Sequence, residues 1–201
     1  MNKSDLLRCI AQKAYDVGFG AKKHFATYDI IEKIPGMIGF LSLSFGIFAL
    51  VFKDLSTEII SATFIVLGVI GLYISMYDHK KSDYVNSGVE LTKLFNELKT
   101  LFLEVKNVPD GNDLTKYESK LSNIDDRFYS VCISKQILFS NWYAHYKFFW
   151  EHQIDWINDE LKFCFFRDKV PLSLWFFILI LLVTSVFSFS RLMNYICVVQ
   201  G

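Results

Sequence analysis

The chain lacks an excess of charge of either sign. Its 201 residues include 21 lysines and arginines and 21 aspartates and glutamates, which cancel. A chain with balanced charge has no overall positive field that would attract nucleic acid. We therefore expect no direct binding of nucleic acid.

Cysteine is scarce, and the signatures of common catalytic and metal sites are missing. The four cysteines are scattered without Cys-x-x-Cys spacing, which favours neither a disulfide framework nor a zinc site. Residues 110–113 lack the alternating ligand positions of an EF-hand and are interpreted as a turn. His145 and His152 lie two helical turns apart, too far to share one metal ion, so we interpret them as solvated or hydrogen-bonded side chains. No nucleophile elbow, phosphate-binding glycine loop or carboxylate pair stands out, and we predict no enzymatic activity and no cofactor.

Charged residues are also absent from three long apolar runs, at positions 35–52, 59–77 and 170–189. The first two contain eighteen and nineteen residues. At about 1.5 Å of rise per residue, each helix reaches across the roughly 30 Å hydrocarbon layer of a membrane. Because only six residues separate them, they are predicted to form a transmembrane hairpin, in preference to two buried helices of a soluble protein. The third run, with Pro171 in its first turn, predicts a third span.

The distribution of lysine and arginine predicts the orientation in the membrane. Six of these residues precede the hairpin and thirteen lie between it and the third span, against Lys53 alone in the hairpin loop and Arg191 alone in the tail. The positive-inside rule then predicts a cytoplasmic N-terminus and central segment, with the C-terminus outside. The expected fold class is an all-α membrane protein. Its predicted parts are an amphipathic N-terminal arm (1–34), the transmembrane hairpin (35–77), a cytosolic helical domain (78–169), a third transmembrane helix (170–190) and a short tail (191–201).

The central segment carries two apolar seams at three-four spacing, separated by a turn at residues 108–113. This pattern predicts an antiparallel helical hairpin, with an intermolecular coiled coil as the alternative. The aromatic-rich stretch 139–166 fits either the membrane surface or packing against that hairpin. The first seam comprises Tyr84, Leu91, Leu94, Leu98, Leu101 and Val105, and the second comprises Leu114, Tyr117, Leu121, Ile124, Phe128, Val131 and Leu138.

Two features mark the N-terminal arm. Ser4 is expected to cap its helix, and Gly18 and Gly20 predict either a kink or a close helix contact. Pro35 is expected to separate the arm from the first span, because the residue before a proline is steered away from helical geometry.

Small residues recur along both hairpin helices. They permit close approach of helix backbones, and serine hydroxyls can bond across helices or face water. Tight packing within the hairpin is the favoured explanation, and a pore lined by these residues in an oligomer is the alternative. Both spans lack charge, which disfavours a proton relay or a charged selectivity ring. The stripe comprises Gly39, Ser42, Gly46 and Ala49 on the first helix and Ser61, Gly68, Gly71 and Ser75 on the second.

The order of these parts resembles a known family. An arm with the sequence AYDVGFGAKKHFATYD (14–29) leads through Lys33-Ile34-Pro35 into a close two-span hairpin and then a helical segment. This arrangement is similar to the SLATT domains, two-transmembrane effectors of bacterial nucleotide-sensing and anti-phage conflict systems. Within them it looks like the subfamily associated with reverse transcriptases.

The resemblance implies an effector of the bacterial inner membrane. Such proteins are expected to form homo-oligomers among membrane lipids and to permeabilise the membrane when a co-encoded reverse transcriptase or nucleotide-signal sensor activates them, which leads to abortive infection. The hypothesis for this chain is that the helical segment passes the trigger to the hairpin through a collar of five residues. A membrane anchor that docks a partner without conducting ions is the alternative function. The collar comprises Tyr77, Asp78, His79, Lys80 and Lys81.

Overall fold

The computed structural model describes the backbone of residues 1–52 and 57–199, and side chains within these ranges as far as Val186. Every regular element in this part of the chain is a helix, which confirms the all-α prediction. The chain divides into two units, residues 1–162 and 163–201. Lys53 and the side chain of Arg191, on which the predicted orientation partly depends, lie outside the described parts.

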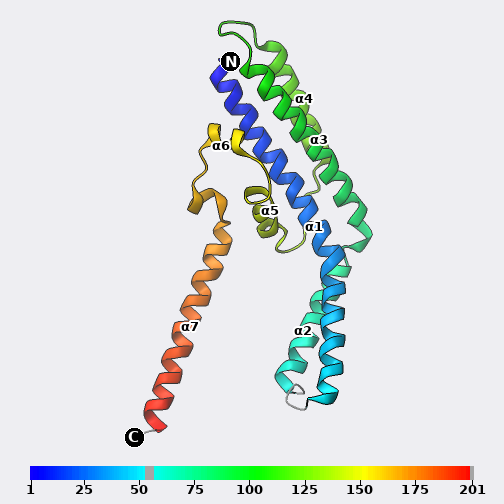
Figure 1. Ribbon diagram of the computed structural model, residues 1–201, viewed down its shortest axis with the longest axis vertical. Helices are drawn as coiled ribbons and strands as arrows, with labels where there is room; N and C mark the ends of the chain where they lie inside the picture. Colours follow the sequence, from blue (N-terminus) through cyan, green and yellow to red (C-terminus); the bar gives the residue numbers. More distant parts are fainter. Residues whose placement is uncertain (53–56, 200–201) are drawn as a thin grey trace. The chain divides into compact units, whose positions relative to one another are not determined.

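The first unit is organised around one very long helix, α1 (Lys3–Val51), shown in blue in Figure 1. Its N-cap is Asn2, whose side chain accepts a hydrogen bond of 2.7 Å from the backbone N–H of Asp5. The prediction that Ser4 caps this helix is therefore wrong. With 49 residues, α1 has room both for a transmembrane span and for a long extension beyond it.

Pro35 does not separate the arm from the span, as predicted, because α1 continues through it. A proline inside a helix removes one backbone hydrogen bond, and neighbouring elements can hold the helix together. Here Ile31 and Ile34 on the preceding turn pack in a cluster with residues of three other segments. The tertiary contacts thus outweigh the local preference of the Ile34-Pro35 pair.

Helix α2 (Glu58–Ser75) runs back along the C-terminal part of α1 and completes the hairpin. A short 3₁₀ turn, η2 (Asp78–Lys80), leads directly into α3 (Lys81–Lys106). Helix α3 packs most extensively along the N-terminal part of α1 (Figure 1). In three facing pairs the residue numbers add to 113: 18 with 95, 25 with 88, and 32 with 81. This constant sum describes an antiparallel helix pair in fixed register.

Helix α4 (Thr115–Val131) returns along α3 and is antiparallel to it. Two ion pairs connect them: Lys120 Nζ lies 2.7 Å from Glu104 Oε2, and Arg127 Nη1 lies 2.7 Å from Glu97 Oε2. The first predicted seam is buried along its whole length, but its main partner is α1 rather than the second seam. The second seam was predicted too long. Its helix ends at Val131, and Leu138 is exposed.

Two shorter helices cover α1 on another side. Helices α5 (Ser140–Phe149) and α6 (Asp155–Leu161) both contact α1. The rings of Phe95, Phe102, Phe148, His152 and Trp156 pack together here, with neighbouring centroids 4.9–6.1 Å apart. Core packing therefore accounts for part of the aromatic-rich stretch. We call the N-terminal part of α1 (residues 3–34) together with α3, α4, α5 and α6 the helical bundle.

The second unit contains a π-helical turn, η3 (Phe165–Lys169), followed by α7 (Leu172–Val199). The apolar side chains of Leu172–Val186 are largely exposed. Helix α7 extends nine residues past the predicted end of the third span at residue 190. A membrane-spanning role for α7 stays a prediction.

Candidate functional site at the junction of hairpin and bundle

The hairpin presents an apolar surface that the rest of its unit does not cover. Both of its helices are long and apolar enough to cross a membrane. In the most apolar 18-residue stretch of each helix, 0% of α1 and 6% of α2 is buried within the chain. A core helix of a soluble protein would be mostly buried, so lipid is the environment that suits these side chains.

The contact between the two hairpin helices is made by a narrow set of side chains. The rings of Phe45 and Phe64 lie 5.2 Å apart, and a Cβ atom on Gly71 would lie 3.8 Å from Ile38 Cδ1. In these pairs the residue numbers add to 109 (45 with 64, 38 with 71), four fewer than between α1 and α3. Four residues are about one helical turn. The register of the chain along α1 therefore shifts by about one turn between Gly71 and Lys81, in the stretch that includes the collar.

The predicted stripe of small residues is divided by this contact. Ser42, Ala49 and Gly71 are half-buried, whereas the other five residues of the stripe are exposed. Apart from the backbone of their own helix, no atom of the described residues lies within 4 Å of a Cβ built on Gly39, Gly46 or Gly68. Packing within one hairpin, the favoured explanation, therefore does not account for these three glycines. The hydroxyls of Ser61 and Ser75 donate hydrogen bonds to carbonyls of their own helix, Thr57 and Gly71.

The exposed glycines share one side of the hairpin. Each residue advances about 100° around an α-helix. Gly46 follows the contact residue Phe45 directly, and Gly68 follows Leu67, a half-buried residue one turn after the contact residue Phe64, so each glycine is rotated in the same sense away from the contact face. Because the helices are antiparallel and face each other, an equal rotation moves both residues to the same side. Gly39, one residue after Ile38, lies on that side as well.

At the collar, the hairpin is joined to the bundle by a small buried cluster. Tyr77 packs with Ile31 of α1, Ile74 of α2 and Tyr84 of α3. Lys81 forms an ion pair with Glu32 of α1, and its Nζ lies 3.8 Å from Asp78 Oδ1. Asp78, His79 and Lys80 are exposed. The structure thus divides the five predicted collar residues into a buried Tyr77, a paired Lys81 and an exposed polar turn between them.

A second connection to this cluster comes from the segment 132–139, which lies between α4 and α5. His24 of α1 is buried, its Nδ1 lies 2.7 Å from the Gly20 carbonyl, and its Nε2 accepts the Ile133 N–H at 3.0 Å. Thr27 donates a hydrogen bond to Gln136 Oε1. Ile137, near the end of the segment, is buried in the collar cluster. Sequence reasoning missed these contacts because His24 and Gln136 are 112 residues apart, and a lone histidine carries no spacing signal.

Helix α5 is fixed to α1 next to this segment by charge. Asp29 accepts hydrogen bonds from Lys147 of α5 and from Lys33, the latter at 2.7 Å. Burial of the Asp29 carboxyl opposes its ionisation, but the bonds from Lys147 and Lys33 outweigh it and lower its pKa. The carboxylate therefore stays ionised at neutral pH and holds the two helices together.

Three histidines of the bundle should make its stability depend on pH. Burial lowers the pKa of His24 and of His145. Burial, with nearby Lys22 and Lys99, lowers that of His152 to about 4. In an unfolded chain each would titrate near 6.5, so below that pH the unfolded state binds more protons than the folded state. The free energy of unfolding is therefore expected to fall as the pH is lowered from 7 to 5, as measured by thermal unfolding in detergent followed by circular dichroism.

His152→Phe should reduce this pH dependence, because the ring lies among Phe95 and Phe148 and a phenyl group cannot take up a proton. His79→Asn, at an exposed position, is the matched control. A melting temperature of the unmodified protein that stays constant between pH 7 and pH 5 would contradict the prediction. The rings of His145 and His152 are packed against aromatic side chains, a contact that the interpretation as solvated or hydrogen-bonded histidines did not include.

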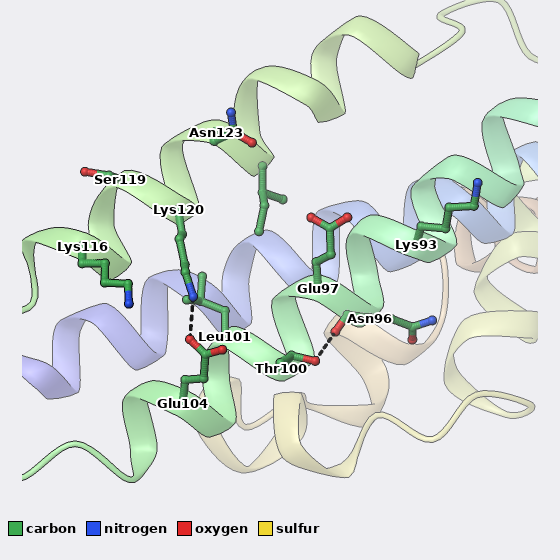
Figure 2. A pocket seen from close by; sticks show the side chains of 11 residues that line it. Lys93, Asn96, Glu97, Thr100, Leu101, Glu104, Lys116, Ser119, Lys120 and Asn123 are labelled. Carbon is green, nitrogen blue, oxygen red and sulfur yellow. Dashed lines mark hydrogen bonds and ion pairs between the residues drawn. The ribbon is translucent and has the colours of Figure 1, made fainter.

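The bundle also carries an open groove of about 870 Å³ between α3 and α4. Figure 2 shows that the Lys120–Glu104 ion pair crosses it, with the side chains of Lys93 and Glu97 further along α3. Lysines and glutamates both line the groove, so no single charge sign selects a ligand. In the described part of the chain, no three His, Cys, Asp or Glu side chains are grouped to hold a metal ion. The remaining lining residues are Asn96, Thr100, Leu101, Lys116, Ser119, Asn123 and Ile124.

Comparison with known proteins identifies the family. No curated protein and no solved structure matches the chain. Residues 1–178, which include the arm, the hairpin and the whole bundle, match the family described as SMODS and SLOG-associating 2TM effector domain 6. The arrangement of a two-helix apolar hairpin continuous with a helical bundle agrees with that description. The chain belongs to this family, a SLATT family of two-transmembrane effectors.

Proposed function

We propose that the protein oligomerises in the bacterial inner membrane and permeabilises it when a co-encoded sensor acts on the helical bundle. The observation that carries this proposal is the direct structural connection between an exposed apolar hairpin and the bundle. Helix α1 belongs to both parts without interruption, and the collar cluster joins α1, α2 and α3 at the boundary. A change in bundle packing would therefore reach the hairpin through rigid elements.

The exposed glycines provide the surface for assembly. A Cβ atom built on Gly39, Gly46 or Gly68 would meet no other element among the described residues, and the three glycines share one side of the hairpin. Small residues let helices of neighbouring copies approach closely in a membrane. In a pore lined by the stripe, its serines would supply the polar groups that conduction requires.

We propose a bacterial conflict system as the setting, with abortive infection as the outcome and a reverse transcriptase or a nucleotide-signal sensor as the co-encoded trigger. The orientation proposed for the chain places the bundle in the cytoplasm, where such a trigger is found. The second candidate function is a non-conducting membrane anchor, and the groove between α3 and α4 favours it as a docking place for a cytosolic partner.

Substituting Gly46 and Gly68 with leucine should abolish depolarisation by the activated protein. Because neither residue contacts the other hairpin helix, the isobutyl groups would obstruct contacts between copies while leaving each hairpin intact. The measurement is the fluorescence of a potential-sensitive dye in cells that express the protein with its activating partner.

Ala62→Leu is the matched control, since Ala62 is an exposed small residue outside the predicted stripe. It should leave depolarisation unchanged. Full depolarisation by the Gly46→Leu/Gly68→Leu variant would contradict assembly through this side. Recruitment of the partner at constant membrane potential in the unmodified protein would support the anchor instead.

A further inference from the structure

The end of the segment 132–139 is held at the depth where the second hairpin helix leaves the membrane. Ile137 is buried in a cluster with Ile74, in the last turn of α2, and Tyr77, two residues past the end of that helix. The Tyr73 side chain, which lies within α2, is close to the backbone of Leu138, and its hydroxyl lies 3.4 Å from that of Tyr77. Tyr84 Oη also donates a hydrogen bond of 2.6 Å to the Lys135 carbonyl. The segment is therefore fixed to α2 and α3 as well as to α1.

The two residues at this end are large, apolar and exposed. Leu138 is 63% exposed and Phe139 is 56% exposed, although the residues on either side, Ile137 and Ser140, are buried. Phe139 has φ of 67°, in the left-handed region that L-residues other than glycine adopt only at a cost. The Ser140 hydroxyl donates a hydrogen bond of 2.7 Å to the Ile137 carbonyl and closes the turn. The fold thus holds the Leu138-Phe139 pair outward at the tip of a constrained turn.

The surroundings of this pair are those of a membrane interface. Leu72, next to Tyr73 in α2, and Met76, the C-cap of that helix, are 71% and 72% exposed and belong to the surface that suits lipid. Lys135 is exposed, and its Nζ lies 5.1 Å from the Tyr77 ring centroid. Tyrosines and lysines are typical of the headgroup level, where an apolar ring and a polar or charged tip are both accommodated.

We infer that Leu138 and Phe139 insert into the boundary between the headgroups and acyl chains of the leaflet in which the hairpin ends. The inference rests on the proposed membrane location of the hairpin. It makes the segment 132–139 a second membrane contact, one that connects the lipid surface to α1 through His24 and Thr27. Continuity with the lipid-facing surface of α2 favours lipid over a protein partner as the occupant.

The test is quenching of a fluorescent probe by lipids that carry a nitroxide near the headgroup. The full chain, with its native cysteines changed to serine, receives a single NBD-labelled cysteine by Leu138→Cys and is reconstituted into vesicles of phosphatidylethanolamine and phosphatidylglycerol. Leu72→Cys reports the hairpin. Leu103→Cys is the matched control: this exposed leucine (51%) lies near the C-terminal end of α3, at the opposite end of the helix from the collar. Phe139→Cys provides a second label position if Leu138→Cys does not fold.

We expect the probe at position 138 to be quenched to a degree close to that at position 72 and several-fold more than at position 103. If nitroxide lipids quench the probe at position 72 while aqueous iodide quenches the probe at position 138, the inference is overturned. The membrane location of the hairpin is then retained. Protection of 138 from both quenchers would also overturn it, because another copy or the second unit would then cover the pair. Absence of lipid quenching at 72 would overturn the membrane location and the inference with it.

Discussion

Replacing Gly18 with valine is expected to lower the free energy of unfolding by about 3 kcal/mol, the upper part of the range for overpacking a buried site. A Cβ atom at this position would lie 2.8 Å from Phe95 Cδ2 and 2.9 Å from Phe148 Cε2. Both rings are buried, and Phe95 is itself enclosed by His152 and Trp156, so neither can withdraw without disturbing the aromatic cluster. The small gain in helix propensity over glycine does not offset this cost. Thermal or denaturant unfolding in detergent, followed by circular dichroism, provides the measurement.

Gly18→Ala should destabilise in the same direction by a smaller amount. Gly20→Ala is the matched control, because its nearest neighbours would lie 3.5 Å and 3.6 Å from the new Cβ, an ordinary contact distance. That variant should be neutral or more stable by up to about 1 kcal/mol, since alanine is the better helix former. If Gly18→Val unfolds at the same denaturant concentration as the unmodified protein, α1 does not approach α3 and α5 as closely as described.

Inserting one alanine between Lys80 and Lys81 is expected to abolish permeabilisation while the protein still reaches the membrane. The insertion rotates α3 by about 100° relative to α2. Helix α3 is held in register along α1 by contacts at Gly18, Phe25 and Glu32, and α2 is held along α1 by a different register. Both registers cannot be kept after the insertion, so the cluster around Tyr77 must be disrupted. Dye-reported depolarisation and toxicity in the presence of the activating partner measure the effect.

An alanine inserted after Gly111 is the control for this experiment. Gly111 lies in the exposed turn between α3 and α4 and has φ of 90°. Turns of this kind accept insertions without loss of the elements they connect. This variant should keep its activity and its abundance in the membrane fraction. Undiminished toxicity of the collar insertion at equal abundance would rule out transmission through the collar.

Much of the architecture could be predicted from local sequence. The missing charges in 35–52 and 59–77 predicted the two apolar helices of the hairpin, and length alone made them able to span a membrane. Three-four spacing identified the buried face of α3 from Tyr84 to Val105. For Gly18 the sequence predicted either a kink or a close helix contact, and the structure has the close contact. The arm, the hairpin and the helical segment that follows them together predicted the family.

Other features depended on residues that are distant in sequence. At Pro35, α1 continues beside a cluster built from Ile31, Ile74 and Ile137, and the burial of His24 involves a segment more than 100 residues away. Which residues of the small-residue stripe are half-buried and which are exposed depended on which faces of α1 and α2 meet.

The sequence by itself determined where apolar residues recur at helical spacing and whether each run of residues suits water or lipid. Charge and hydrophobicity are properties of the residues themselves. Only the tertiary structure decided the partner of each face: α1 for the seam of α3, and, among the described residues, no neighbour within 4 Å of a Cβ atom built on Gly39, Gly46 or Gly68. The physical reason is that a helical face carries the same apolar pattern whatever it packs against. The register that selects its partner is set by contacts between distant parts of the chain.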